Sequence, residues 1–232
     1  MTEAEWHNGI HAIGMLLFQR ERASQRQVLL FNIACCRRVW NLLTDEDRKA
    51  VDEFEMSSDD SVAVAGLEER YSPPPIRYRT FHSENGGVAV LPEFEGQPEP
   101  GTDLCTRLAA RGWSIGGVAH ETQKLAAGNT PRGIVIGAAC EEAERRGQSL
   151  LLRDIFGNPF RPVAFSPELR TTTAVAIAQQ MYESRDFSAM PILADALQDA
   201  GCDNDDILNH CRDANATHVR GCWVVDLVLG KE

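Results

Sequence analysis

Three consecutive prolines at positions 73–75 divide the sequence into helical parts. Proline has no amide hydrogen and clashes with the preceding turn, so a helix cannot run through this triplet. The stretch from 73 to 101 holds six of the eleven prolines, and the residues from Ser83 to Thr106 include five acids and neither Lys nor Arg. We therefore expect N-terminal helices over 1–72, a Pro-rich acidic insert over 73–101 and C-terminal helices over 102–232.

The first of these parts shows the period of amphipathic helices. Apolar residues three and four positions apart form a stripe between 29 and 43, which places them on one face of a helix that begins at Ser24. Thr44, followed by three acids, is suited to begin the next helix, because its hydroxyl can accept bonds from free amides. A further short helix is expected near 59–71.

The insert allows two structures. Residues 76–82 alternate with period two, residues 85–87 (Asn-Gly-Gly) supply turn residues, and an apolar run follows at 88–91. This pattern is typical of a β-hairpin, 76–82 with 88–91. The alternative is an extended Pro-rich connection.

Helices are expected again after the insert, at 103–112, 133–157, 171–183, 191–201, 203–212 and 219–231. The β-branched residues near the C-terminus suit a strand, but Gly230 favours a helix end. The predicted fold class is therefore mainly α: one compact multi-helix domain, 1–232, with a small β-hairpin or extended insert near 76–92. About seventy residues alone bury little surface, so we expect Trp40 and Trp223 to share one core.

Composition limits the functional classes. The net charge of −11 opposes binding to nucleic acids and anionic membranes. There is no run of 18 apolar residues and no signal-like N-terminus, so we expect a cytoplasmic protein without a membrane partner. Seven cysteines, an odd number, favour reduced thiols over a disulfide framework. The expected partner is another protein.

Several blocks of the sequence are distinctive: MTEAEW, ACCRRVW, LLRDIFGNPFRPV, LADALQDAGC and HVRGCWVVDLVLGKE. Together they resemble a family of short, mostly uncharacterised bacterial proteins that occur as many paralogues in one genome. The likeness covers residues 1–50 and 150–232. Relatives usually carry an Ala-rich helical stretch in between, and the Pro-rich segment 73–101 departs from it. The resemblance implies that the two ends form one unit and implies no particular chemistry.

A metal site is the most specific chemical hypothesis. The candidate ligands, with His210 as a spare, are Cys202, Cys211, His218 and Cys222. Three thiolates and an imidazole suit tetrahedral Zn²⁺, but zinc modules usually bring two ligands together on a tight turn, and these spacings do not. The alternative, favoured by the apolar residues that follow Cys222, is that the cysteines are core residues. We therefore assign no metal, cofactor or catalytic residue.

Other reactive groups have simpler interpretations. Cys35 and Cys36 adjoin two arginines, which could activate a thiol, but Cys36 lies on the apolar stripe and indicates a core position. His7 and His11 are one helical turn apart, and we expect them to be exposed rather than metal-bound. The 191–212 region has helix–turn–helix spacing, but three aspartates at its second helix oppose DNA binding.

The segments that resemble the bacterial family, 1–50 and 150–232, are here called the family-like blocks. They contain several arginines, among them Arg37, Arg38, Arg161, Arg212 and Arg220. We expect most of them to be structural clamps, for example Arg220 with Asp226, although arginine is also common at interfaces.

Two functional hypotheses follow. Enzyme motifs are absent from the sequence, which favours a non-enzymatic protein-interaction or adaptor module. The alternative is a zinc-stabilised domain, structural or catalytic, built on Cys202, Cys211, His218 and Cys222.

Overall fold

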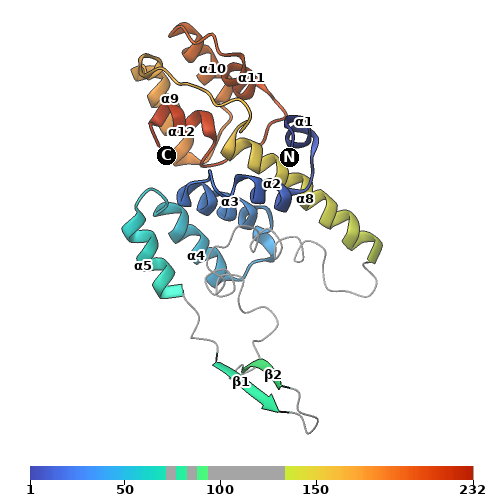
Figure 1. Cartoon of the computed structure of the whole chain (residues 1–232). Helices are drawn as coiled ribbons and strands as arrows, with labels where there is room; N and C mark the ends of the chain where they lie inside the picture. Colours follow the sequence, from blue (N-terminus) through green and yellow to red (C-terminus); the bar gives the residue numbers. More distant parts are fainter. Residues whose placement is uncertain (72–76, 83–87, 94–133, 232) are drawn as a thin grey trace.

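The computed structural model describes residues 1–71, 77–82, 88–93 and 134–231 (Figure 1). These residues are mainly helical, which confirms the predicted fold class. The helix expected at 103–112 lies outside the described residues. The α-helices are α1 (Glu3–Asn8), α2 (Ala12–Gln19), α3 (Gln25–Arg38), α4 (Asp45–Met56), α5 (Ser61–Tyr71), α8 (Ile134–Phe156), α9 (Thr172–Ser184), α10 (Met190–Asp199), α11 (Asp205–Arg212) and α12 (Trp223–Leu229), and the 3-10 helices are η1 (Trp40–Leu42) and η2 (Pro167–Leu169).

The alternating segment forms a β-hairpin. Strand β1 (Arg77–His82) pairs antiparallel with β2 (Val88–Glu93), with Arg77 opposite Glu93 and His82 opposite Val88. The strands begin and end within two residues of the ranges expected from the alternation. The Asn-Gly-Gly segment expected as the turn lies outside the described residues.

Side-chain caps set where the helices begin and end. The Ser24 hydroxyl accepts a bond of 3.2 Å from the amide of Gln27, and the Thr44 hydroxyl accepts one of 3.1 Å from Asp47. Both belong to reciprocal capping boxes, as expected for these N-termini. Gly230 ends α12 with a φ of 67°, so the C-terminal segment is a helix rather than a strand.

The buried apolar residues form two separate cores. The N-terminal core combines α1 to α5 with the end of α8, and the C-terminal core combines α9 to α12. Figure 1 shows the second group of helices gathered beyond α3, with α8 passing α2 and α3. The N-terminal core includes Trp6, Phe31, Phe54, Leu151, Leu152 and Ile155, and the C-terminal core includes Ala178, Tyr182, Met190, Leu193, Cys211 and Val225.

The expectation that Trp40 and Trp223 share a core is wrong. Trp40 is half-buried against the N-terminal core, and Trp223 is half-buried against the C-terminal core. The Arg37 guanidinium lies 4.1 Å from the centre of the Trp40 ring, so that tryptophan packs under a charged side chain at the surface. Trp6 is fully buried instead, and its Nε1 donates to the carbonyl of Gly157 over 3.0 Å.

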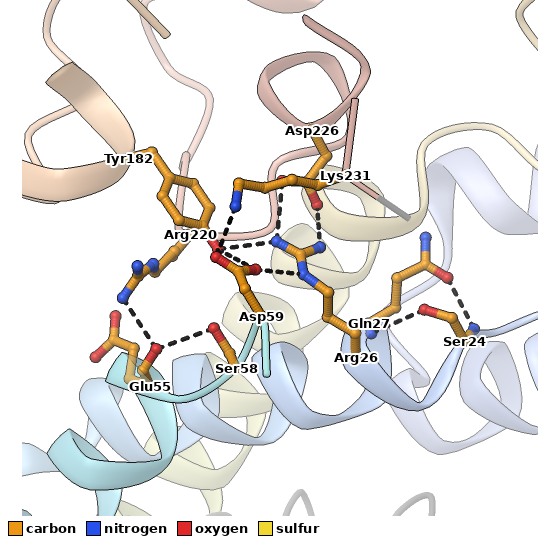
Figure 2. Close-up of polar contacts among 10 residues, drawn as sticks. All are labelled: Ser24, Arg26, Gln27, Glu55, Ser58, Asp59, Tyr182, Arg220, Asp226 and Lys231. Carbon is orange, nitrogen blue, oxygen red and sulfur yellow. Dashed lines mark hydrogen bonds and ion pairs between the residues drawn. The ribbon is translucent and has the colours of Figure 1, made fainter. Parts of the chain in front are cut away.

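Five polar side chains connect the two cores, and we call them the polar seam (Figure 2). Arg26 of α3 donates to Asp226 of α12 over 2.6 Å, to Asp59 over 2.8 Å and to the Tyr182 hydroxyl over 2.9 Å. Lys231 donates to Asp59 over 2.6 Å. The side chains of Arg26 and Asp226 are only 12% and 10% exposed, so this ion pair is shielded from water.

The arginines of the family-like blocks act as clamps, but Arg220 does not pair with Asp226 as expected. Arg26 occupies that carboxylate, and Arg220 instead donates to the backbone carbonyl of Glu55 over 2.9 Å and lies 4.2 Å from the centre of the Tyr182 ring. The remaining pairs are Arg37 with Asp52 and Glu55, Arg38 with Glu144, Arg161 with Glu3, and Arg212 with Asp195.

The first prediction concerns Asp59. Burial opposes its ionisation, but hydrogen bonds from Lys231, Arg26 and Tyr182 outweigh burial and lower its pKa to about 2. Hydrogen bonds to a charged group are strong, so Asp59→Asn should lower the free energy of unfolding by about 2 kcal/mol and the melting temperature by roughly 4–8 °C at pH 7. Asp199→Asn, at an exposed position, is the control and should leave the melting temperature unchanged.

The pH dependence of this effect has a definite sign. Because the folded-state pKa of Asp59 lies below the value of about 3.9 in an unfolded chain, its contribution is complete above about pH 4 and is lost as the pH falls toward about 2. Thermal melts should therefore show the wild type and the Asp59→Asn variant converging over that range. A constant difference in melting temperature would contradict the ionised role of Asp59.

The second prediction concerns two glycines with similar backbones. Gly221 has a φ of 97° and Gly201 a φ of 94°, but a Cβ at Gly221 would lie 2.9 Å from Leu30 Cδ1, whereas a Cβ at Gly201 would meet no atom within 4 Å. Both alanine variants carry the backbone strain, and only Gly221→Ala also displaces Leu30 at the junction of the cores. Urea unfolding should show Gly221→Ala to be less stable than Gly201→Ala by about 1–3 kcal/mol. Equal losses would show that Leu30 moves aside freely.

Candidate metal centre

Four side chains that could bind a metal ion converge at one point: Asp154, His210, His218 and Cys222. We call them the ligand cluster. One donor atom from each lies within 4.8 Å of all the others. His218 Nδ1 is 2.8 Å and His210 Nε2 is 3.2 Å from Asp154 Oδ1. Cys222 Sγ is 3.2 Å from His210 Nε2 and 3.8 Å from His218 Nδ1.

Local structure positions each of these groups. Asp154 lies near the end of α8, and its second oxygen accepts the backbone amide of Val219 over 2.9 Å. His210 lies in the last turn of α11, with its ring 5.2 Å from that of Trp223. His218 belongs to the loop that follows α11, and Cys222 is the residue that caps α12.

The spacing of the donor atoms is close to that of tetrahedral coordination. Zinc bonds of about 2.0–2.3 Å to oxygen, nitrogen and sulfur place neighbouring ligand atoms of a tetrahedron about 3.3–3.6 Å apart. Four of the six donor–donor separations range from 2.8 to 3.8 Å, with the longest involving sulfur, and all six lie within 4.8 Å. An ion could therefore enter between these atoms after small side-chain adjustments.

The charge of Asp154 also favours a cation here. Its side chain is 2% exposed, and among the described residues its polar partners are the two histidines and the Val219 amide, with no Arg or Lys. Burial opposes ionisation, but hydrogen bonds from His210 and His218 outweigh it and lower the pKa of Asp154. A buried carboxylate requires a compensating positive charge, which a divalent ion would supply.

The thiol of Cys222 is suited to a metal and not to free reactivity. Burial raises its pKa well above the usual value, whereas the backbone amides of Val224 and Val225 at the start of α12 lower it by hydrogen bonding. A bound metal ion removes the proton from a coordinating thiol. The same two amides would then stabilise the thiolate.

The arrangement does not fit a Cys–His–Asp catalytic relay. In such a relay the imidazole uses one nitrogen for the thiol and the other for the carboxylate. Here Nε2 of His210 faces both Cys222 and Asp154. The thiol is also fully buried, so a substrate could not reach it.

The cluster differs from the ligand set expected from the sequence. The structure brings together His218 and Cys222 of that set and adds the spare His210. Cys202 and Cys211 are buried among the apolar residues of the C-terminal core, and Asp154 completes the group. Asp154 was missed because α8 lies more than fifty residues before His210. The available signal was an acid between the apolar residues 150–152 and 155–156, although Arg153 lies next to it.

The other candidates are placed as expected. Cys35 and Cys36 are fully buried in the N-terminal core, and His7 and His11 are exposed. Helices α10 and α11 pack together, with the aspartates at the start of α11 exposed.

None of the helices within the described ranges is both long and apolar enough to cross a bilayer. Comparisons with protein-family models, with curated proteins and with solved structures gave no match to the chain.

The third prediction tests whether the vicinal cysteines are inert. Burial raises the pKa of Cys35 well above its usual value, and it raises the pKa of Cys36 to about 12. Only the thiolate reacts readily, so iodoacetamide at pH 8 should leave both residues unmodified in the native protein and should modify both in urea. Peptide mass spectrometry measures this. Rapid modification of either cysteine in the native state would contradict the core assignment.

Proposed function

We propose that the protein is a helical domain stabilised by one Zn²⁺ ion, bound by Asp154, His210, His218 and Cys222. The observation that carries the proposal is the convergence of four donor atoms on one buried point. A thiolate, two imidazoles and a carboxylate form a donor set that suits zinc in tetrahedral geometry.

The proposed role of the ion is structural. Catalytic zinc sites keep one position for water or substrate, whereas four protein ligands close the coordination sphere. The side chains of Asp154 and His218 are 2% and 7% exposed, Cys222 is fully buried and His210 is 17% exposed. Such burial leaves no room for a substrate beside the ion.

The fourth prediction is the metal content. Elemental analysis of the purified full-length protein should find about one zinc per chain. A ligand present at 1,000 times its Kd adds about 4 kcal/mol of stability, so chelation should lower the melting temperature by roughly 8–16 °C. The proposal would be contradicted by less than half an equivalent of zinc per chain together with a melting temperature that does not change when a chelator is added.

Alanine variants of the buried cysteines separate the two possible ligand sets. Cys222→Ala removes a thiol from the ligand cluster, whereas Cys202→Ala and Cys211→Ala remove equally buried thiols from the core. All three create small cavities, so stability alone does not distinguish them. Zinc content should fall in Cys222→Ala and stay near one equivalent in the other two. Loss of zinc from all three would instead support the set expected from the spacing of the cysteines.

Two sequence-based hypotheses stay predictions. A protein-interaction or adaptor role is compatible with a closed metal site, and a pull-down with tagged full-length protein tests it. Recovery of no partner, together with turnover of a small-molecule panel, would count against that role. The resemblance to the paralogous bacterial family is tested by aligning its members. All four proposed ligands lie within the family-like block 150–232, so members that keep this block should keep them.

A further inference from the structure

The ligand cluster draws its members from both cores. Asp154 belongs to α8, where its neighbours Leu151, Leu152 and Ile155 are buried in the N-terminal core. The other three ligands belong to the C-terminal part of the chain. His210 lies in the last turn of α11, His218 in the loop after it, and Cys222 caps the start of α12 and is buried in the C-terminal core. An ion held by all four side chains would therefore be bonded to both cores at once.

Several further contacts between the cores are polar. The polar seam joins α3 and the turn at Asp59 to α9 and α12 (Figure 2). Arg220 donates to the backbone carbonyl of Glu55, and Arg185 pairs with the Glu55 carboxylate. Charged groups regain their hydration when such an interface opens, so ion pairs resist opening less than an equal apolar area would. Apolar contacts also cross the junction: Val219 packs against the N-terminal core, and Leu30 lies close to Gly221.

We propose that metal binding controls whether the two cores are docked. This inference rests on the proposed zinc site. With the ion bound, Asp154 is tied to the three C-terminal ligands and the polar seam stays closed. Without the ion, the Asp154 carboxylate loses the cation that compensates its charge, and separation of the cores allows both the carboxylate and the imidazoles to be hydrated. Each core keeps its own apolar packing in that open state.

Hydrogen–deuterium exchange on the full-length protein tests this, with the zinc-loaded form compared with the chelated form. After chelation, amides of α12 and of the first turns of α3 should exchange at least about tenfold faster, because these segments carry the polar seam. Amides of the first two turns of α4, away from Glu55, and of α10 lie inside the separate cores and should keep their protection.

The outcomes separate the two proposals. Absence of zinc from the purified protein removes the proposed function and this inference together. Stoichiometric zinc whose removal leaves the exchange of the polar seam unchanged overturns only the docking inference. Loss of protection throughout both cores also overturns it, because the ion would then support the whole fold and not the junction.

A matched pair of variants on α8 gives the fifth prediction. Asp154→Asn removes the single ligand contributed by the N-terminal core, so the zinc-loaded variant should exchange at the polar seam like the chelated wild type. Glu144→Gln is the control: this carboxylate is also buried on α8, but its partner Arg38 belongs to the same half of the protein. It should exchange at the polar seam like the loaded wild type. Equal effects of the two variants would contradict a docking role for Asp154.

Discussion

The ion pair between Arg26 and Asp226 fixes how the two halves of the protein meet. Both side chains are largely buried, so removing one of them would leave the other charge buried and uncompensated, which is strongly destabilising. The Arg26 guanidinium also donates hydrogen bonds to Asp59 and to the Tyr182 hydroxyl, and its planar geometry allows few orientations of these partners. These contacts hold the first turn of α3 next to α12.

Helix α12 depends on contacts at both of its ends. Seven residues form too short a helix to be stable alone, so its stability must come from its surroundings. Cys222 attaches its beginning to the ligand cluster, while Asp226 in its first turn and Lys231 beyond its end attach it to the polar seam. Between these points its valines fill the C-terminal core.

Local chemistry made much of the fold predictable. Ser24, Thr44 and Gly230 mark helix ends because their capping depends on neighbours in sequence, and the hairpin follows from alternation within a few residues. The pairing of Arg26 with Asp226 and the separation of Trp40 from Trp223 could not be predicted, because they depend on how distant helices pack. The same holds for the ligand cluster. His218 and Cys222 were candidate ligands because they lie close together in the sequence, whereas the signal for Asp154 was weak and did not link it to the distant histidines.

The division of buried residues between the cores has a consequence for the order of folding. The C-terminal core is built from consecutive elements, α9 to α12, so its contacts close short loops. The N-terminal core needs Leu151, Leu152 and Ile155, which are separated from α5 by more than sixty residues that include the β-hairpin. Non-local contacts form slowly because the loop must close before they stabilise the chain. During synthesis the N-terminal core therefore cannot be completed until α8 has left the ribosome. The C-terminal core, which is synthesised later, forms from contacts that are closer in sequence.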